Sequence, residues 1–139
     1  MSVVVVDASV AVKWFVPEPH APATHRLLVG RWTLMAPELI WVEVANALRK
    51  CVQRAELTYE AAEEILRNFK QFPLQTYPIK TLFESAWSLA MQHQVSVYDG
   101  LYLALAVSRD CHLVTADRRF HDAIRAGSLA GNIVWVENI

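Results

Sequence analysis

The stretch of this sequence that decides the fold is Ser2-Val3-Val4-Val5-Val6-Asp7-Ala8-Ser9. Four consecutive valines predict a strand that is buried on both faces, because a half-buried strand would alternate apolar and polar residues. Such strands occur in parallel sheets that helices cover on both sides. Asp7 ends the strand, and an ionised carboxylate among buried neighbours is costly unless a cation or hydrogen bonds stabilise it.

Beyond this stretch, strand and helix signals alternate, and no repeat or linker divides the chain. The alternation predicts an α/β fold, with a parallel sheet between layers of helices, as a single domain over residues 1–139. Pro37 suits the first turn of a helix, and Thr58 can cap the next one. The expected strands cover residues 2–6, 33–36, 74–77, 112–115 and 133–136. The expected helices cover residues 7–15, 21–29, 37–54, the segment after Thr58 that contains Phe69, and residues 81–93, 98–109 and 118–125.

The composition excludes several classes of protein. The 13 basic and 14 acidic residues give a net charge of −1, so no global charge attracts nucleic acid or a membrane surface. No apolar run is long enough for a membrane span, and the N-terminus lacks the features of a signal peptide. Cys51 and Cys111 have no paired spacing, which favours free thiols in a cytoplasmic protein. Apolar residues make up 54% of the chain, so either a very apolar core or a covered surface, such as a homodimer interface, is expected.

Four acidic residues lie in apolar sequence where separate segments are expected to meet. In open α/β sheets, ligands bind beyond the carboxyl ends of the strands. Asp7 ends the first strand and Asp117 follows the fourth by two residues, so both lie at this edge. Glu43 has apolar neighbours inside a helix, and Asp99 begins a helix that is apolar nearly all round, so its side chain points into the protein or a cleft.

Each acid also has a purely structural interpretation. Asp7 and Asp117 can act as N-caps of the helices that follow them. Asp99 lies three residues after Ser96, which is the spacing of a capping box. Glu43 can belong to a narrow solvent-exposed stripe on its helix. Four carboxylates at one edge nevertheless repel one another unless a cation binds them, and Mg²⁺ or Mn²⁺ prefers such oxygen ligands.

Four sequence blocks together resemble the PIN-domain ribonucleases of the VapC toxin type. The blocks are Val6-Asp7-Ala-Ser9-Val-Ala-Val-Lys-Trp-Phe, Glu43-Val-Ala-Asn46-Ala-Leu, Tyr98-Asp99-Gly-Leu-Tyr-Leu-Ala-Leu-Ala, and Leu113-Val-Thr115-Ala-Asp117-Arg-Arg-Phe120. They occur in the family's order over the whole chain. The resemblance implies a Rossmann-like three-layer α/β/α sandwich with strand order 3-2-1-4-5. It also implies a metal-dependent endoribonuclease, the toxin of a toxin–antitoxin pair, which a cognate antitoxin holds inactive.

The resemblance assigns roles to individual residues. Asp7, Glu43, Asp99 and Asp117 correspond to the acidic site that binds Mg²⁺ or Mn²⁺. Residues expected to orient these carboxylates or bound waters are Ser9, Asn46 and Thr115. Candidate contacts to RNA phosphates are Lys13, Arg49, Arg118 and Arg119, although these cations can equally be ordinary surface charges.

Two other functions compete with the nuclease hypothesis. A phosphoacceptor receiver domain has clustered acids at the same sheet edge, but it requires adjacent acids after the first strand, and here Ala8 and Ser9 follow Asp7. A PIN-fold module that binds partners without cleaving RNA is the second alternative. Because of the apolar surplus, a groove around Trp14, Phe15 and Trp41 is expected to accept an amphipathic helix or extended segment of an antitoxin, although tryptophan side chains can equally fill the core.

Overall fold

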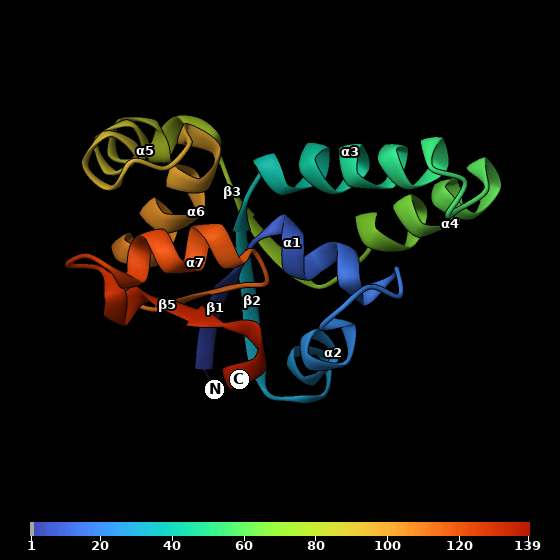
Figure 1. Cartoon of the computed structure of the whole chain (residues 1–139), viewed down its shortest axis with the longest axis horizontal. Helices are drawn as coiled ribbons and strands as arrows, with labels where there is room; N and C mark the ends of the chain where they lie inside the picture. Colours follow the sequence, from blue (N-terminus) through green and yellow to red (C-terminus); the bar gives the residue numbers. More distant parts are fainter. Residues whose placement is uncertain (1) are drawn as a thin grey trace.

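A five-stranded parallel sheet forms the centre of the molecule, and the computed structural model describes it together with its helices over residues 2–139 (Figure 1). The strand order is β3-β2-β1-β4-β5, so the predicted order is confirmed. In the central strand β1, Val4, Val5 and Val6 are at most 1% exposed although successive side chains point to opposite faces. Both faces of the sheet are therefore covered. The strands are β1 Ser2–Val6, β2 Trp32–Pro37, β3 Leu74–Tyr77, β4 His112–Thr115 and β5 Ile133–Trp135.

Seven α-helices surround the sheet in the described part of the chain. Figure 1 shows α3 and α4 reaching away from the sheet on one side, whereas α5 lies against α6 on the other. None of the helices within residues 2–139 has the length and apolar character needed to cross a membrane. The helices are α1 Ala8–Ala11, α2 Ala21–Val29, α3 Leu39–Gln53, α4 Tyr59–Lys70, α5 Ile79–His93, α6 Val97–Ser108 and α7 Arg118–Arg125.

The expectation that Pro37 begins a helix was wrong. Pro37 is the last residue of β2 and pairs in register with Tyr77 of β3, so it does not begin a helix. The backbone N–H of Glu38 continues this pairing by donating to the Tyr77 carbonyl at 2.8 Å, and α3 starts only at Leu39. The helix expected over residues 7–15 is one turn of α-helix that tightens into a 3₁₀ helix at Val12–Trp14.

Helix α6 forms the middle of the core next to the sheet. Its residues from Gly100 to Ala106 are all buried, and it packs against β1, β2, β4 and α5. Gly100 makes the close approach to α5 possible, because a Cβ atom at this position would lie 2.6 Å from the Ala86 carbonyl oxygen. Since Asp99 precedes Gly100 directly, the packing of α6 on α5 fixes the position of this acid.

Replacing Gly100 with alanine is therefore expected to destabilise the protein. The backbone of α5 has to shift to accept the methyl group, and we expect the free energy of unfolding to fall by about 1–3 kcal/mol, as for other overpacked sites. Urea denaturation measures the change. Gly131→Ala is the matched control, because a Cβ there meets nothing within 4 Å. Equal stabilities of the two variants would show that α5 and α6 have room to separate at no cost.

Candidate active site

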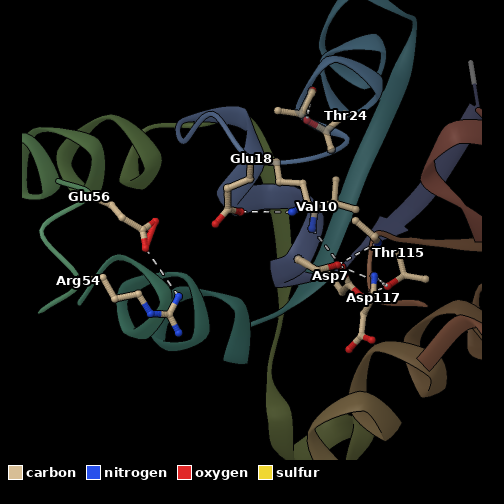
Figure 2. Close-up of polar contacts among 12 residues, drawn as sticks. Asp7, Val10, Glu18, Thr24, Arg54, Glu56, Thr115 and Asp117 are labelled. Carbon is tan, nitrogen blue, oxygen red and sulfur yellow. Dashed lines mark hydrogen bonds and ion pairs between the residues drawn. The ribbon is translucent and has the colours of Figure 1, made fainter. Parts of the chain in front are cut away.

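Asp7 is buried at the carboxyl end of the central strand, with 5% of its surface exposed. Its Oδ1 accepts a hydrogen bond from the Ser9 hydroxyl at 2.5 Å. The same oxygen accepts a second one from the Val10 backbone N–H at 3.2 Å (Figure 2). Its Oδ2 accepts a hydrogen bond from the Thr115 hydroxyl at 2.5 Å. Asp7 thus caps α1, as the structural interpretation expected, and also joins β1 to β4 through its side chain.

Ser9 and Thr115 connect Asp7 to the loop that carries the next acid. The backbone N–H of Ala116 donates to Ser9 Oγ at 2.9 Å, and the N–H of Asp117 donates to Thr115 Oγ1 at 3.0 Å. Figure 2 shows Asp117 next to Asp7 and Thr115. These bonds tie the end of β4 to the end of β1, so two acids from distant parts of the chain lie at one edge of the sheet.

Asp117 begins α7 and caps it. The backbone N–H groups of Arg119 and Phe120 donate to Asp117 Oδ1 at 3.1 and 3.2 Å. Both cap bonds end on the same oxygen, so Oδ2 is not used by the cap. The capping role and a role in a cation site are therefore compatible for this residue.

The remaining two acids come from α6 and α3. Ser96 caps α6 by accepting a hydrogen bond from the Asp99 backbone N–H at 3.0 Å, as the spacing indicated. Glu43 Oε1 accepts a hydrogen bond from the Tyr102 hydroxyl at 2.7 Å. Tyr102 was missed at the level of sequence, because it lies in a run of apolar residues. Its position three residues after Asp99, on the same side of α6, is the one signal that could have indicated it.

The pKa values show that the four acids form one electrostatic cluster. Burial raises the pKa of Asp7 from 3.8 to about 7, the Ser9 and Thr115 hydroxyls oppose this rise, and the charge of Asp99 adds to it. Burial also raises the pKa of Asp99 to about 6, with further contributions from the charges of Asp117 and Glu43. Each carboxylate is therefore linked to at least one other by repulsion.

The acids are nevertheless not packed as a complete cage. Within residues 2–139, no three His, Cys, Asp or Glu side chains are placed to hold a metal ion by themselves. A hollow of about 330 Å³ adjoins two of the acids. Its lining includes Gln94, Ser96, Asp99, Asp117 and Arg119. There is thus space at the acids for water and for a substrate group.

The remaining predicted residues differ in how close they come to the acids. Asn46 is exposed on α3, one turn after Glu43, and its side-chain oxygen accepts a hydrogen bond from Arg49 Nε at 3.3 Å. Arg119 lines the hollow at the acids. Lys13, Arg49 and Arg118 are not among the residues that line this hollow.

Lys13 and Arg118 are engaged by neighbouring side chains. Lys13 Nζ forms an ion pair with Glu18 Oε1 at 3.2 Å. The Arg118 guanidinium stacks 3.8 Å from the centre of the Trp135 ring, which holds the first turn of α7 against the last strand. Either cation has to leave this partner, or share it, to contact RNA.

Comparisons with known proteins found a matching family and several similar proteins. The PIN domain family model matches residues 4–125. Ribonuclease VapC9 of Mycobacterium tuberculosis is 34% identical over 123 residues, which cover 88% of this chain and 92% of that protein. Ribonuclease VapC3 of Pyrobaculum aerophilum is 32% identical over 124 residues, covering 88% of this chain and 95% of that protein.

Solved structures share the fold over nearly the whole chain. PAE2754 from Pyrobaculum aerophilum superposes with a TM-score of 0.69 at 24% identity, covering 97% of this chain and 90% of that one. A chain of a toxin–antitoxin complex from Klebsiella pneumoniae superposes with a TM-score of 0.67 at 16% identity, covering 94% of this chain and 95% of that one. At these identities the structural likeness concerns the fold alone.

The raised pKa values predict how stability depends on pH in the absence of metal. Because folding raises the pKa of Asp7 from its ordinary value of 3.8 to about 7, the folded protein binds more protons across this interval than the unfolded chain does. Stability is therefore fully present at low pH and falls as pH rises towards 7, by up to about 1.4 kcal/mol per pH unit for a buried carboxyl. Urea denaturation in EDTA at about pH 5 and about pH 7.5 measures this dependence. Asp7→Asn is expected to flatten it and to raise stability at the higher pH; equal slopes in both proteins would contradict the assignment.

Proposed function

The chain belongs to the PIN-domain family, and from this premise we propose that it is a divalent-metal-dependent endoribonuclease, the toxin of a toxin–antitoxin pair. The observation that carries the proposal is the clustering of Asp7, Glu43, Asp99 and Asp117 at the carboxyl edge of the sheet, where the charge of Asp99 raises the pKa of Asp7 and the charges of Asp117 and Glu43 raise the pKa of Asp99. Relatives at 34% identity that are called ribonucleases support it.

The donor chemistry of the cluster fits Mg²⁺ or Mn²⁺. All four side chains supply carboxylate oxygens, which hard divalent cations prefer, and no imidazole or thiolate competes with them in the cluster. Mg²⁺ usually keeps several waters and binds few carboxylates directly, which suits a hollow that Asp99 and Asp117 line without forming a closed cage. A bound cation would also relieve the repulsion that raises the pKa of Asp99.

In this proposal Asp7, Asp99 and Asp117 bind the cation directly or through water, and Glu43 is a further ligand or orients the attacking water. When bound, the cation lowers the pKa of water and stabilises charge on the phosphodiester. Ser9 and Thr115 hold the Asp7 carboxylate in place through the hydrogen bonds described above.

Two further proposed roles concern the surroundings of the acids. Asn46, which bonds Arg49, lies on the same helix as Glu43 and orients Glu43 or a water when substrate is present. Arg119 is the cation best placed to contact an RNA phosphate, because it lines the hollow next to Asp99 and Asp117. Arg49 is exposed and bonds only the exposed side chain of Asn46 among the contacts described above, so it can reach a more distant phosphate. Lys13 pairs with Glu18, and Arg118 stacks on Trp135.

An antitoxin is proposed to bind the apolar face between α3 and α4. Trp41, Leu66, Phe69 and Lys70 line a hollow there, and Val42, which follows Trp41 in α3, is 62% exposed. Trp14 was expected to contribute to this groove, but it is only 8% exposed and stacks on Phe72 at 4.8 Å between ring centres. Trp14 therefore fills the core, and the proposed groove for an amphipathic segment centres on Trp41.

A homodimer is proposed to form through α5. Phe83, Trp87 and Met91 are spaced four residues apart on this helix and are 58%, 57% and 64% exposed. Large apolar side chains at this spacing form one stripe on a helix, and such a stripe on a small domain marks an association surface. The high apolar content of the chain thus corresponds to two apolar surfaces, one on α5 and one between α3 and α4.

The alternative function, a PIN-fold module without catalysis, predicts no cleavage by the intact protein. All four acids are present, which favours an enzyme. A cytoplasmic location remains a prediction from the cysteines, neither of which forms a disulfide.

Asp7→Asn is expected to abolish RNA cleavage in a folded protein, because the side chain keeps its size but loses its charge and replaces one accepting oxygen with an N–H donor. Gel assays on structured RNAs with Mg²⁺ or Mn²⁺, and with EDTA as the metal-free reference, measure the loss. Asp110→Asn is the matched control, since Asp110 is exposed at the other end of α6 with a φ of 50°, which asparagine tolerates. Full cleavage by Asp7→Asn, or cleavage that EDTA leaves unchanged, would refute the proposed mechanism.

Trp87→Lys is expected to convert the dimer into a monomer, because the substitution places a charge in the apolar stripe on α5. Sedimentation equilibrium of both proteins measures the mass. Val29→Lys adds the same charge at a residue of α2 that is 87% exposed, and it should leave the dimer intact. A monomeric parent protein at micromolar concentrations would exclude the proposed dimer.

A further inference from the structure

We propose that Tyr102 is the positioning residue that holds the Glu43 carboxylate in the acid cluster; the inference rests on the proposed function and adds a residue to its site. The Tyr102 hydroxyl donates to Glu43 Oε1 at 2.7 Å and connects α6 with α3 across 59 residues of sequence. This is the direct link between the helix that carries Asp99 and the helix that carries Glu43.

Tyr102 is a rigid anchor for this bond. It is 1% exposed and is among the largest fully buried side chains in the described structure. Helix α6 is itself fixed, because it packs on three strands and because Gly100 lets it approach α5 closely. The phenol ring therefore has little freedom to move, and the position of its hydroxyl is fixed.

Glu43 has no comparable support from its own helix. It is only half-buried, and its neighbours Val42 and Asn46 are exposed, so one side of α3 at this point faces solvent. A glutamate side chain has three rotatable bonds and loses considerable conformational entropy when it is held in one position. Among the described residues, the hydrogen bond from Tyr102 is what keeps this carboxylate turned towards α6.

The electrostatic surroundings keep Tyr102 a donor. Burial, followed by the charge of Glu43 and then the charges of Asp7 and Asp99, raises the pKa of the Tyr102 hydroxyl well above its ordinary value. The hydroxyl is thus close enough to three of the four acids to respond to their charges. A neutral donor here stabilises a carboxylate without adding a positive charge that would compete with a bound cation.

The bond also limits what Glu43 does in the reaction. With Oε1 engaged by Tyr102, the carboxylate presents a fixed orientation, and its Oε2 is the oxygen that does not take part in the bond. Fixing a catalytic carboxylate in this way affects the chemical step more than RNA binding, because the RNA contacts lie on other side chains.

Tyr102→Phe tests the inference, because it removes the hydroxyl and keeps the ring in the core. We expect a folded protein with kcat about 10–100-fold lower, KM for RNA unchanged, and Mn²⁺ affinity reduced in calorimetric titrations. In a Glu43→Ala background, the same substitution should cause no further loss, since its target is gone. Tyr59→Phe is the matched control: it removes a tyrosine-to-glutamate hydrogen bond, to Glu63 at 3.1 Å, on the exposed face of α4.

Three results would overturn the inference: unchanged kcat and Mn²⁺ affinity in Tyr102→Phe, an equal loss of kcat in the Glu43→Ala background, or a loss in KM alone. A crystal structure of Tyr102→Phe decides the matter even if the parent protein cleaves no RNA, which would refute the proposed function separately. The inference requires the Glu43 carboxylate to leave its position or become disordered in that structure. A carboxylate that stays in place contradicts it.

Discussion

The burial of the Asp7 carboxylate at the end of the central strand is the constraint on which the rest of the site depends. A charge at this depth is tolerable only because hydroxyls and a backbone N–H surround it, and these donors come from α1 and from the end of β4. The same bonds fix the first turn of α1 and the loop that leads to Asp117. The hydrogen bonds to this one carboxylate therefore position the segments at the edge of the sheet where the other acids lie.

The cluster retains an electrostatic imbalance. Donors offset part of the cost of burying Asp7, yet the pKa of Asp7 and of Asp99 remains raised although Arg119 lines the hollow beside Asp99 and Asp117. A site whose own cations fully balanced the acids would leave no affinity for a metal ion. Tyr102 likewise adds no positive charge to the acid cluster, because the hydroxyl that donates to Glu43 is neutral.

Much of this arrangement could be predicted from short-range patterns. The valine run predicted the buried central strand, and the positions of Asp7 and Asp117 after their strands predicted their common edge. The pattern could not predict Tyr102, because an apolar helix shows no sign of which side chain meets a glutamate from α3. Pro37 was misplaced because pairing with Tyr77 in the sheet overrides its preference for a helix start. Trp14 was misplaced because an aromatic residue fills a core or a groove equally well, and only its stacking on Phe72 decides between them.

Calorimetric titration of Mn²⁺ into the metal-free protein at neutral pH examines the acid cluster without any RNA. We expect saturable binding that is accompanied by proton release, because Asp7 and Asp99 are partly protonated before the cation binds. We also expect Asp99→Asn to lose this binding while remaining folded. The absence of saturable heat in the parent protein, or undiminished binding by Asp99→Asn, would contradict the proposed cation site.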